Sequence, residues 1–354
     1  MRYLIDAMEL GHNPKGISRV LEALTPRIVS QASNDVFVAC TSEGAQRLRD
    51  VPGNRIITVR RHVQSHWEQL ALPMTARRIG ASAVYSHRES GAIWGPPLVL
   101  HVPEDPEVRW SRTSPDSARG LLRLVYSRMT MRLALRRSVA AASSTSVAIG
   151  LSERYGIPLD SIRIIPLGVD LTMFTPAQNP AADTIFHLGS TDPRDRTPMV
   201  VDAWVEARRR DSTLPRLVIG GTLGDLTDDV RRRAGELAVE VELTGRLTDA
   251  ELVAHLQHAA VVVQPSSDEG FGLQPLEAMA CGAPLVVTRD AAVLEVVGDA
   301  AIVADGTADA LSSGIVYALR EAGRLRAGAR ARAKLYSWER CAEATLAALG
   351  AAAQ

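Results

Sequence analysis

The sequence predicts an α/β fold built from two doubly wound parallel sheets. Short apolar runs alternate with longer helical patterns along the chain, which is typical of parallel strands joined by helices. These runs are too numerous for one sheet of ordinary size, and a chain of 354 residues has room for two domains. We therefore expect two Rossmann-like domains, each with helices on both faces of its sheet.

The expected elements follow from the positions of the apolar runs. A helix should begin near Ile17, and further helices are expected over 199–210, 249–259 and 275–281. Residues 171–183 contain two prolines and no amphipathic pattern, which predicts a linker. We place the domains at 1–175 and 176–330, with a final helix in 331–354 that crosses back to the N-terminal domain. The predicted strands are 1–6, 36–40, 56–59, 83–85, 98–101, 146–149, 163–166, 184–188, 216–220, 240–244, 260–264, 284–288 and 300–304.

Composition excludes several classes of protein. Hydrophobic residues make up 46% and charged residues 23%, as in a soluble globular protein. The formal net charge is zero and aromatic residues are only 4%, so a nucleic-acid partner is not expected. The cysteines Cys40, Cys281 and Cys341 form no CxxC pair, and no apolar run approaches a membrane span, which favours the cytoplasm.

The most informative segment is 261–288, which has the pattern strand, loop, short helix, strand. Gly270 and Gly272 let the loop backbone approach a ligand closely, and Pro275 suits a first helical turn. Gly282 suits the position just past the helix. The loop N–H groups and the start of the helix would then converge on one point, which predicts an anion site.

Two glutamates flank this predicted anion site. Glu269 begins the loop, and Glu277, eight positions later, is expected on the first turn of the helix. Carboxylates beside an anion site make sense when they accept hydrogen bonds from hydroxyl groups. A ribose and a sugar would supply such hydroxyls, although an ordinary βαβ unit with a glycine loop is the alternative.

The run EGFGLQPLEAMACGAPLVV closely resembles the E-x7-E signature of the family-4 retaining glycosyltransferases, which have the GT-B fold. Other segments resemble the same family in the same order. They are PKGISRV after the first strand, VAIGLSERYG and IRIIPLGVD near the end of the N-terminal domain, VELTGRLTDAEL, LEVVGDAAIVAD, and SWERC in the final helix.

The resemblance implies a role for each matching residue. The C-terminal domain would bind the nucleotide-sugar donor, with Glu277 on the ribose and Glu269 on the sugar hydroxyls. The N-terminal domain would bind the acceptor, and His101 would face the donor sugar. Neither a metal nor a cofactor is implied. Further donor contacts would come from Gly16, from the base-binding positions Arg246 and Leu247, and from the backbone of Gly270, Phe271, Gly272 and Leu273.

The sequence departs from the family at the turn after the first strand of the donor domain. Ser190 stands where some members have Arg, and Asp195 stands where a Lys belongs. Arg194 and Arg196 flank that place, and either could bind the diphosphate in a bidentate way. We expect one of them to replace the missing lysine.

A basic helix is expected over 119–137. Arginines recur there at nearly helical spacing with apolar residues between them, and no acidic residue occurs from Ser117 to Ser152. Such a helix can lie on an anionic membrane surface or bind an acidic acceptor, and it can also be a packed helix with a solvated face. Peripheral contact with the inner face of a membrane is therefore one possibility.

These observations favour a metal-independent retaining glycosyltransferase of the hexosyltransferase type. Its partners would be a UDP- or GDP-type sugar donor and a hydroxyl acceptor from a glycolipid, polysaccharide or natural-product pathway in a bacterium. The alternative is a degenerate subunit that binds nucleotide sugars, or a pseudo-glycosyltransferase without ordinary glycosidic transfer. A phosphorylase would need a lysine for pyridoxal phosphate, and Lys15 and Lys334 lie in no matching context. A sugar-nucleotide epimerase lacks support from the glycine loop and the final helix.

Overall fold

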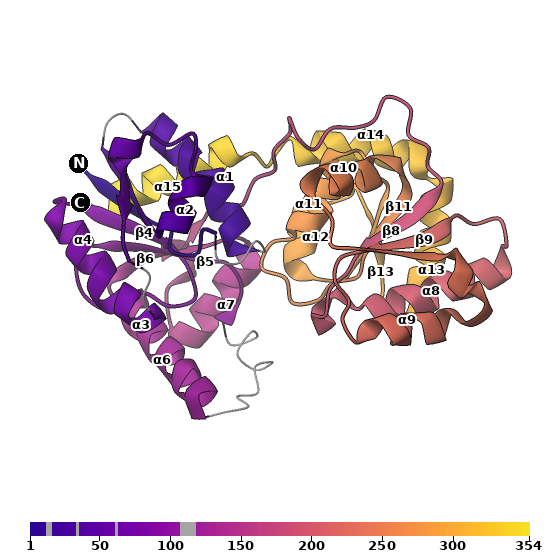
Figure 1. The fold of residues 1–354 in the computed structure, drawn as a ribbon, viewed down its shortest axis with the longest axis horizontal. Helices are drawn as coiled ribbons and strands as arrows, with labels where there is room; N and C mark the ends of the chain where they lie inside the picture. The colour runs from indigo at the N-terminus through magenta and orange to yellow at the C-terminus, as the bar shows by residue number, and fades with distance from the viewer. Residues whose placement is uncertain (12–15, 33–34, 61–62, 107–117) are drawn as a thin grey trace. The chain divides into compact units, whose positions relative to one another are not determined.

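The computed structural model describes residues 1–11, 16–32, 35–60, 63–106 and 118–354. The chain divides into two compact units. The first unit contains Met1–Gly168 together with Ser337–Gln354, and the second contains Val169–Tyr336. Each unit has one parallel sheet with helices on both faces, so the predicted fold class is confirmed (Figure 1).

The first unit holds a seven-stranded sheet in the order β3-β2-β1-β4-β5-β6-β7, in which every neighbouring pair is parallel. The order reverses between β1 and β4, which makes that pair the switch point of the sheet. The strands are β1 (Tyr3–Asp6), β2 (Val36–Cys40), β3 (Ile56–Thr58), β4 (Ala83–His87), β5 (Leu98–Val102), β6 (Ser138–Ala142) and β7 (Arg163–Ile164).

The helices of this unit cover both faces of its sheet. The C-terminal helix α15 packs on α1 and on strands β4, β5 and β6, whereas α6 packs on β5 and β6. The helical segments are α1 (Ile17–Gln31), α2 (Ser42–Arg47), η1 (Gly53–Arg55), α3 (Gln64–His66), η2 (Trp67–Ala71), α4 (Leu72–Arg78), α6 (Ala118–Leu135), α7 (Thr145–Tyr155), η3 (Leu159–Ser161) and α15 (Trp338–Ala352).

The second unit holds a six-stranded parallel sheet in the order β10-β9-β8-β11-β12-β13, with its switch point between β8 and β11. Its strands are β8 (Thr184–Leu188), β9 (Arg216–Gly220), β10 (Val241–Gly245), β11 (Ala259–Gln264), β12 (Leu285–Thr288) and β13 (Ile302–Ala304). Its helical segments are η4 (Pro193–Asp195), α8 (Thr197–Arg210), α9 (Leu226–Ala234), η5 (Gly235–Glu240), α10 (Asp249–His258), α11 (Leu273–Ala280), α12 (Ala291–Val297), α13 (Ala308–Arg320) and α14 (Ala322–Ala333).

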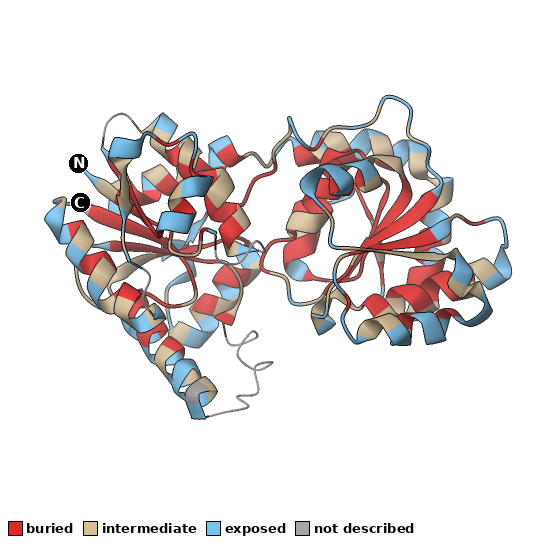
Figure 2. Ribbon diagram, in the orientation of Figure 1, coloured by how far each residue is buried: buried red, intermediate tan, exposed pale blue. Residues whose placement is uncertain are grey.

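The central strands are buried on both faces, as expected for parallel sheets covered by helices (Figure 2). In the second unit, Trp204 of α8 is fully buried beside Ile219 and Val263 of the sheet. In the first unit, Trp67 and Leu100 belong to the corresponding core. Within the described ranges, no helix has both the length and the apolar character needed to cross a bilayer.

One predicted strand is wrong. Residues 146–149 lie in helix α7, and the strand of this region is β6, which ends at Ala142. The Ser144 side chain caps the helix by accepting a hydrogen bond from the Val147 N–H at 3.3 Å. Gly156 ends the helix in the left-handed conformation, with φ of 66°. The two caps bracket one helix, and they outweigh the short apolar run that favoured a strand.

The chain passes between the units at two places, 168–169 and 336–337. The backbone N–H of Val169 donates to the carbonyl of Tyr336 at 3.2 Å. The predicted linker 171–183 belongs to the second unit, where the Arg330 guanidinium donates to the carbonyl oxygens of Leu171 and Phe174. The chain therefore first enters the second unit at 168–169, before Pro176, which is the start of the predicted C-terminal domain.

Gly168 gives a test of this packing. A Cβ atom there would lie 2.2 Å from the backbone nitrogen of Trp338, so the backbone must move to accept it. We expect Gly168→Ala to lower the free energy of unfolding by about 1–3 kcal/mol, the range for overpacked sites. Urea unfolding of both proteins measures the change.

The matched control is Gly328→Ala in helix α14, where an added Cβ would meet no atom within 4 Å. That change should stabilise the protein by roughly 0.5–1 kcal/mol, because alanine favours a helix over glycine. Equal effects of the two substitutions would contradict the packing described at Gly168.

Candidate functional site

The candidate site of the second unit lies in the two loops that flank its switch point. The loop after β8 spans 189–196, and the loop after β11 spans 265–272. In open α/β sheets, ligands bind outside the carboxyl ends of the strands at this position. The predicted residues Ser190, Arg194 and Arg196 lie in the first loop, and Glu269 and Gly270 lie in the second. The fold thus brings together segments about 75 residues apart in sequence.

Three hydrogen bonds hold the loop after β11 in place. The backbone N–H of Glu269 donates to Asp290 Oδ2 at 3.0 Å. The hydroxyl of Thr288 donates to the carbonyl of Ser266 at 3.0 Å, and the N–H of Ser267 donates to the carbonyl of Arg194 at 3.3 Å. The loop is therefore tied both to the end of β12 and to the neighbouring loop.

Gly272 sets the direction in which helix α11 begins. It is the N-cap residue with φ of 103°, a conformation that favours glycine, and a Cβ there would lie 3.3 Å from Val293. The helix starts at Leu273, two residues earlier than expected. Glu277 consequently lies on the second turn and not on the first, which corrects our prediction. Its side chain is buried, as is the ring of Phe271.

Glu269 has the strongest electrostatic perturbation in this loop. Burial raises its pKa from 4.5 to about 7, because desolvation penalises the carboxylate. The Arg194 guanidinium opposes this shift, whereas the carboxylates of Asp290 and Asp195 add to it. Near pH 7, Glu269 is therefore divided between a form that donates a hydrogen bond and a form that only accepts.

The turn after β8 is organised by its own acidic residues. Ser190 Oγ donates to Asp195 Oδ2 at 2.6 Å, so the two residues that we expected at the family's basic positions bind each other. Arg194 donates to Asp192 Oδ2 from Nε at 3.0 Å and from Nη2 at 2.8 Å. Arg196 has a left-handed backbone, with φ of 48°, and Nη1 lies 3.1 Å from where a Cβ on Gly306 would be. Arg194 is thus paired with Asp192 in this structure, whereas Arg196 extends towards the loop after β13.

Two glycines meet where β8 and β9 end. A Cβ on Gly221 would lie 2.0 Å from the carbonyl oxygen of Gly189, and Gly221 has φ of 101°. A Cβ on Gly220 would lie 2.7 Å from Leu247 Cδ1, which places the Leu247 side chain over the end of β9. Arg246 is exposed beside it. The predicted base-binding residues therefore lie at the carboxyl end of the sheet.

His101, in the first unit, lies inside the protein. Its ring is 0% exposed, with Nδ1 2.8 Å from the Tyr85 hydroxyl and Nε2 3.1 Å from Ser143 Oγ. Burial lowers its pKa well below 6.5, with a further contribution from His87, so the ring is neutral. As placed, His101 contacts protein groups on both nitrogens, and its predicted contact with a donor sugar would require the ring or its surroundings to move.

Gly16 is the N-cap of α1 and has φ of 59°. This positive φ explains the need for glycine at that position. The neighbouring residues Pro14 and Lys15, which form part of the predicted glycine loop, lie outside the described residues.

A buried charged cluster at the other switch point was not predicted from the sequence. Arg88, directly after β4, lies 3.6 Å from Asp6, 2.9 Å from Glu9 and 3.3 Å from Glu68. Asp6 ends β1 and accepts hydrogen bonds from Trp67 Nε1 and Ser86 Oγ, both at 2.9 Å. A carboxylate that ends an apolar strand was the one signal for it. Glu68 and Arg88 gave none, because only the fold brings them to Asp6.

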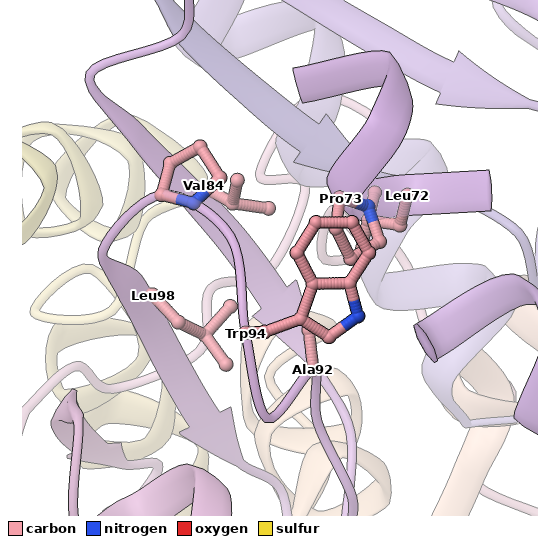
Figure 3. Close-up of a pocket in the computed structure, with 7 residues that line it drawn as sticks. Leu72, Pro73, Val84, Ala92, Trp94 and Leu98 are labelled. Carbon is pink, nitrogen blue, oxygen red and sulfur yellow. The ribbon is translucent and has the colours of Figure 1, made fainter. Parts of the chain in front are cut away.

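The small cavity beside Trp94 is not a ligand site. It has a volume of about 10 Å³, roughly the room for one water, and apolar side chains line it (Figure 3). Among the described residues, no group of three or more His, Cys, Asp or Glu side chains could hold a metal ion.

Comparisons with known proteins assign the second unit to a family. Residues 182–321 match the model of the family described as glycosyl transferases group 1. The GDP-mannose-dependent alpha-(1-6)-phosphatidylinositol dimannoside mannosyltransferase of Mycobacterium tuberculosis is 33% identical over 202 residues, 53% of this chain and 52% of that protein. The D-inositol 3-phosphate glycosyltransferase of Pseudarthrobacter chlorophenolicus is 36% identical over 162 residues, 42% of this chain and 39% of that protein.

The matches span about half the length of these curated relatives or less. Over the whole chain, the structure resembles HepE of Anabaena in complex with UDP, with a TM-score of 0.75, 16% identity, and coverage of 99% of this chain and 100% of that one. At this identity the likeness concerns the fold. It confirms the GT-B architecture. The match of residues 182–321 agrees with the family resemblance for the second unit.

The raised pKa of Glu269 predicts a dependence of stability on pH. The neutral form favours folding, so this contribution is complete below pH 4.5 and is lost as the pH rises through about 7. Glu269→Gln keeps a neutral side chain. We expect the variant to gain stability relative to the wild type between pH 5 and pH 8, by on the order of 2 kcal/mol.

Denaturant unfolding of both proteins at the two pH values measures this difference. Glu236→Gln, which makes the same substitution at an exposed glutamate of the same unit, is the control. A difference for Glu269→Gln that stays constant with pH would mean that the carboxyl of Glu269 is not perturbed in the folded protein.

Proposed function

We propose that this chain, whose residues 182–321 match the group 1 glycosyltransferases, is a member of that family. It would move a hexose, with retention of configuration, from a nucleotide-diphosphate donor to a hydroxyl acceptor. One observation carries the proposal. The run that matches the family's donor signature begins in the loop after β11 and continues into helix α11, at the switch point of the second unit, where a nucleotide sugar would meet it.

In this proposal, the second unit binds the donor. Glu277 accepts hydrogen bonds from the ribose hydroxyls, and Glu269 binds hydroxyls of the transferred sugar. Backbone N–H groups of the loop from Gly270 to Leu273 and the start of α11 face the diphosphate, since a helix N-terminus favours anions. Leu247 and Arg246 border the pocket for the base. No metal takes part.

We propose that Arg196 supplies the cation that the leaving diphosphate needs. Arg194 would first have to leave Asp192, whereas Arg196 has no such bidentate pairing among the described contacts. A positive charge held in place to stabilise the negative charge that develops in the transition state usually contributes much of the rate enhancement. A UDP or GDP donor fits the relatives, one of which is named as GDP-mannose-dependent, while HepE holds UDP.

The first unit would bind the acceptor, a hydroxyl of a glycolipid, polysaccharide or natural-product precursor. Gly16 would lie beside the diphosphate, and His101 would approach the donor sugar after rearrangement. The protein would work in the cytoplasm, in peripheral contact with a membrane when its acceptor is carried by lipid.

The Ser190–Asp195 pair also favours a second candidate, a degenerate protein that binds nucleotide sugars without transferring them. The acid that stands in place of a lysine is held by a 2.6 Å hydrogen bond at the phosphate-binding turn. A negative charge there opposes the leaving of a diphosphate.

Calorimetric titration with UDP, GDP, ADP and dTDP tests the donor site. We expect one nucleotide to bind, and both Glu277→Ala and Arg196→Ala to weaken it about tenfold or more, because each removes a hydrogen bond to a charged group. Arg194→Ala should weaken it less. Glu236→Ala and Arg231→Ala, on exposed residues of the same unit, are the controls.

Binding that survives the loss of Glu277 and Arg196 would place the nucleotide elsewhere and contradict the proposed site. The matching sugar nucleotide then separates the two candidates. A transferase should release the nucleotide diphosphate by transfer or by slow hydrolysis, whereas a degenerate protein should bind the donor and leave it intact.

A further inference from the structure

Helix α6 carries an unusual outward face. Among the described residues, 17 large hydrophobic side chains are exposed, and five of them lie on this one helix, whereas no other helix or strand carries more than one. The five are Leu121, Leu122, Val125, Met129 and Leu133, with exposed fractions from 37% to 70%. These apolar side chains are therefore exposed to water and are not part of the hydrophobic core of the first unit.

The fold of the first unit does not depend on this face. The opposite side of α6 is packed, since Met131 and Ala134 are fully buried in the core. The Tyr126 hydroxyl donates to Glu68 Oε2 at 2.8 Å and accepts from Gln69 Nε2 at 3.1 Å, which joins the helix to η2. Figure 2 shows exposed residues along α6 on the outside of this unit.

Four of the five exposed apolar residues form a single stripe. Leu122, Val125, Met129 and Leu133 are spaced by three, four and four residues, which places them on one side of a helix. With 3.6 residues per turn, Arg128 and Arg132 fall on one flank of the stripe and Arg123 falls on the other. All three arginines are exposed.

Charge identifies what would cover this stripe. No acidic residue occurs from Ser117 to Ser152, although the whole chain has equal numbers of acidic and basic residues. An apolar stripe flanked by arginines lies well in the interface of an anionic bilayer, where the apolar side chains reach the acyl boundary and the arginines meet lipid phosphates.

We propose that the outward face of α6 is a docking surface for an anionic lipid bilayer. Its apolar stripe enters the headgroup layer, and the flanking arginines bind the phosphates. This extends the proposed membrane contact to named side chains, and it depends on the proposed function only for its purpose, since docking needs neither donor nor acceptor.

The first test places a reporter in the stripe. Cys40, Cys281 and Cys341 are all buried, so a thiol-reactive fluorophore sensitive to polarity will label Met129→Cys selectively. We expect the emission of the labelled protein to shift to the blue with phosphatidylcholine vesicles that contain phosphatidylglycerol, and not with phosphatidylcholine alone. Val239→Cys, at an exposed apolar residue of the second unit, should show no shift.

The second test reverses charge at the flanks. Arg123→Glu/Arg132→Glu should weaken sedimentation with the anionic vesicles at least about tenfold, because each arginine near an anionic surface contributes to binding. Arg231→Glu/Arg320→Glu makes the same change in net charge on exposed residues of the second unit and should stay within about twofold.

Three results would overturn the proposal. They are a label at position 129 that ignores anionic vesicles, equal losses for the two charge-reversal variants, and a shift that follows protein concentration without vesicles. The last would mean that a second copy of the chain covers the stripe. The vesicle experiments contain no nucleotide, so a negative result in them does not affect the donor-binding proposal. The nucleotide titration tests that proposal separately.

Discussion

The carboxylate of Asp290 holds together the segment on which the second unit's site depends. Its Oδ1 caps α12 by accepting from the Val293 N–H at 3.1 Å, while its Oδ2 accepts from the Glu269 N–H at 3.0 Å. One buried side chain thus fixes the start of a helix and the loop after β11 at the same time. The loop geometry is set by the protein before a ligand arrives, which is what a preorganised binding site requires.

This arrangement concentrates negative charge at the switch point. Asp192, Asp195, Glu269 and Asp290 lie in or beside the two loops, and Arg194 interacts with two of them. A diphosphate would be repelled there unless some of the charge were removed. The raised pKa of Glu269 does this in part, because a protonated Glu269 adds no negative charge and can donate a hydrogen bond to a sugar oxygen. Protonation of Glu269 would thereby partly offset the absence of a lysine at position 195.

Many of the strands and turns could be predicted from the sequence, because apolar runs and glycines determine the backbone conformation of their own segment. The strands 184–188 and 216–220 appear with the predicted bounds, and Gly282 follows α11 in the left-handed conformation that its position requires. The error at 146–149 arose because three apolar residues in a row suit either a strand or a helix, and the Ser144 cap decided between them. Other features depend on contacts between distant segments. The role of Asp290 and the full cluster of Asp6, Glu68 and Arg88 could not be predicted, because their partners lie 20 to 82 residues away.

The central claim is that a nucleotide sugar binds where the loops after β8 and β11 meet. Hydrogen–deuterium exchange with and without a saturating nucleotide diphosphate tests it most directly, because it reports the position of the ligand without a substitution. The account predicts slower exchange of the backbone amides in 189–197 and 265–280 within the second unit. Unchanged exchange in both segments, with protection elsewhere in the chain, would contradict it.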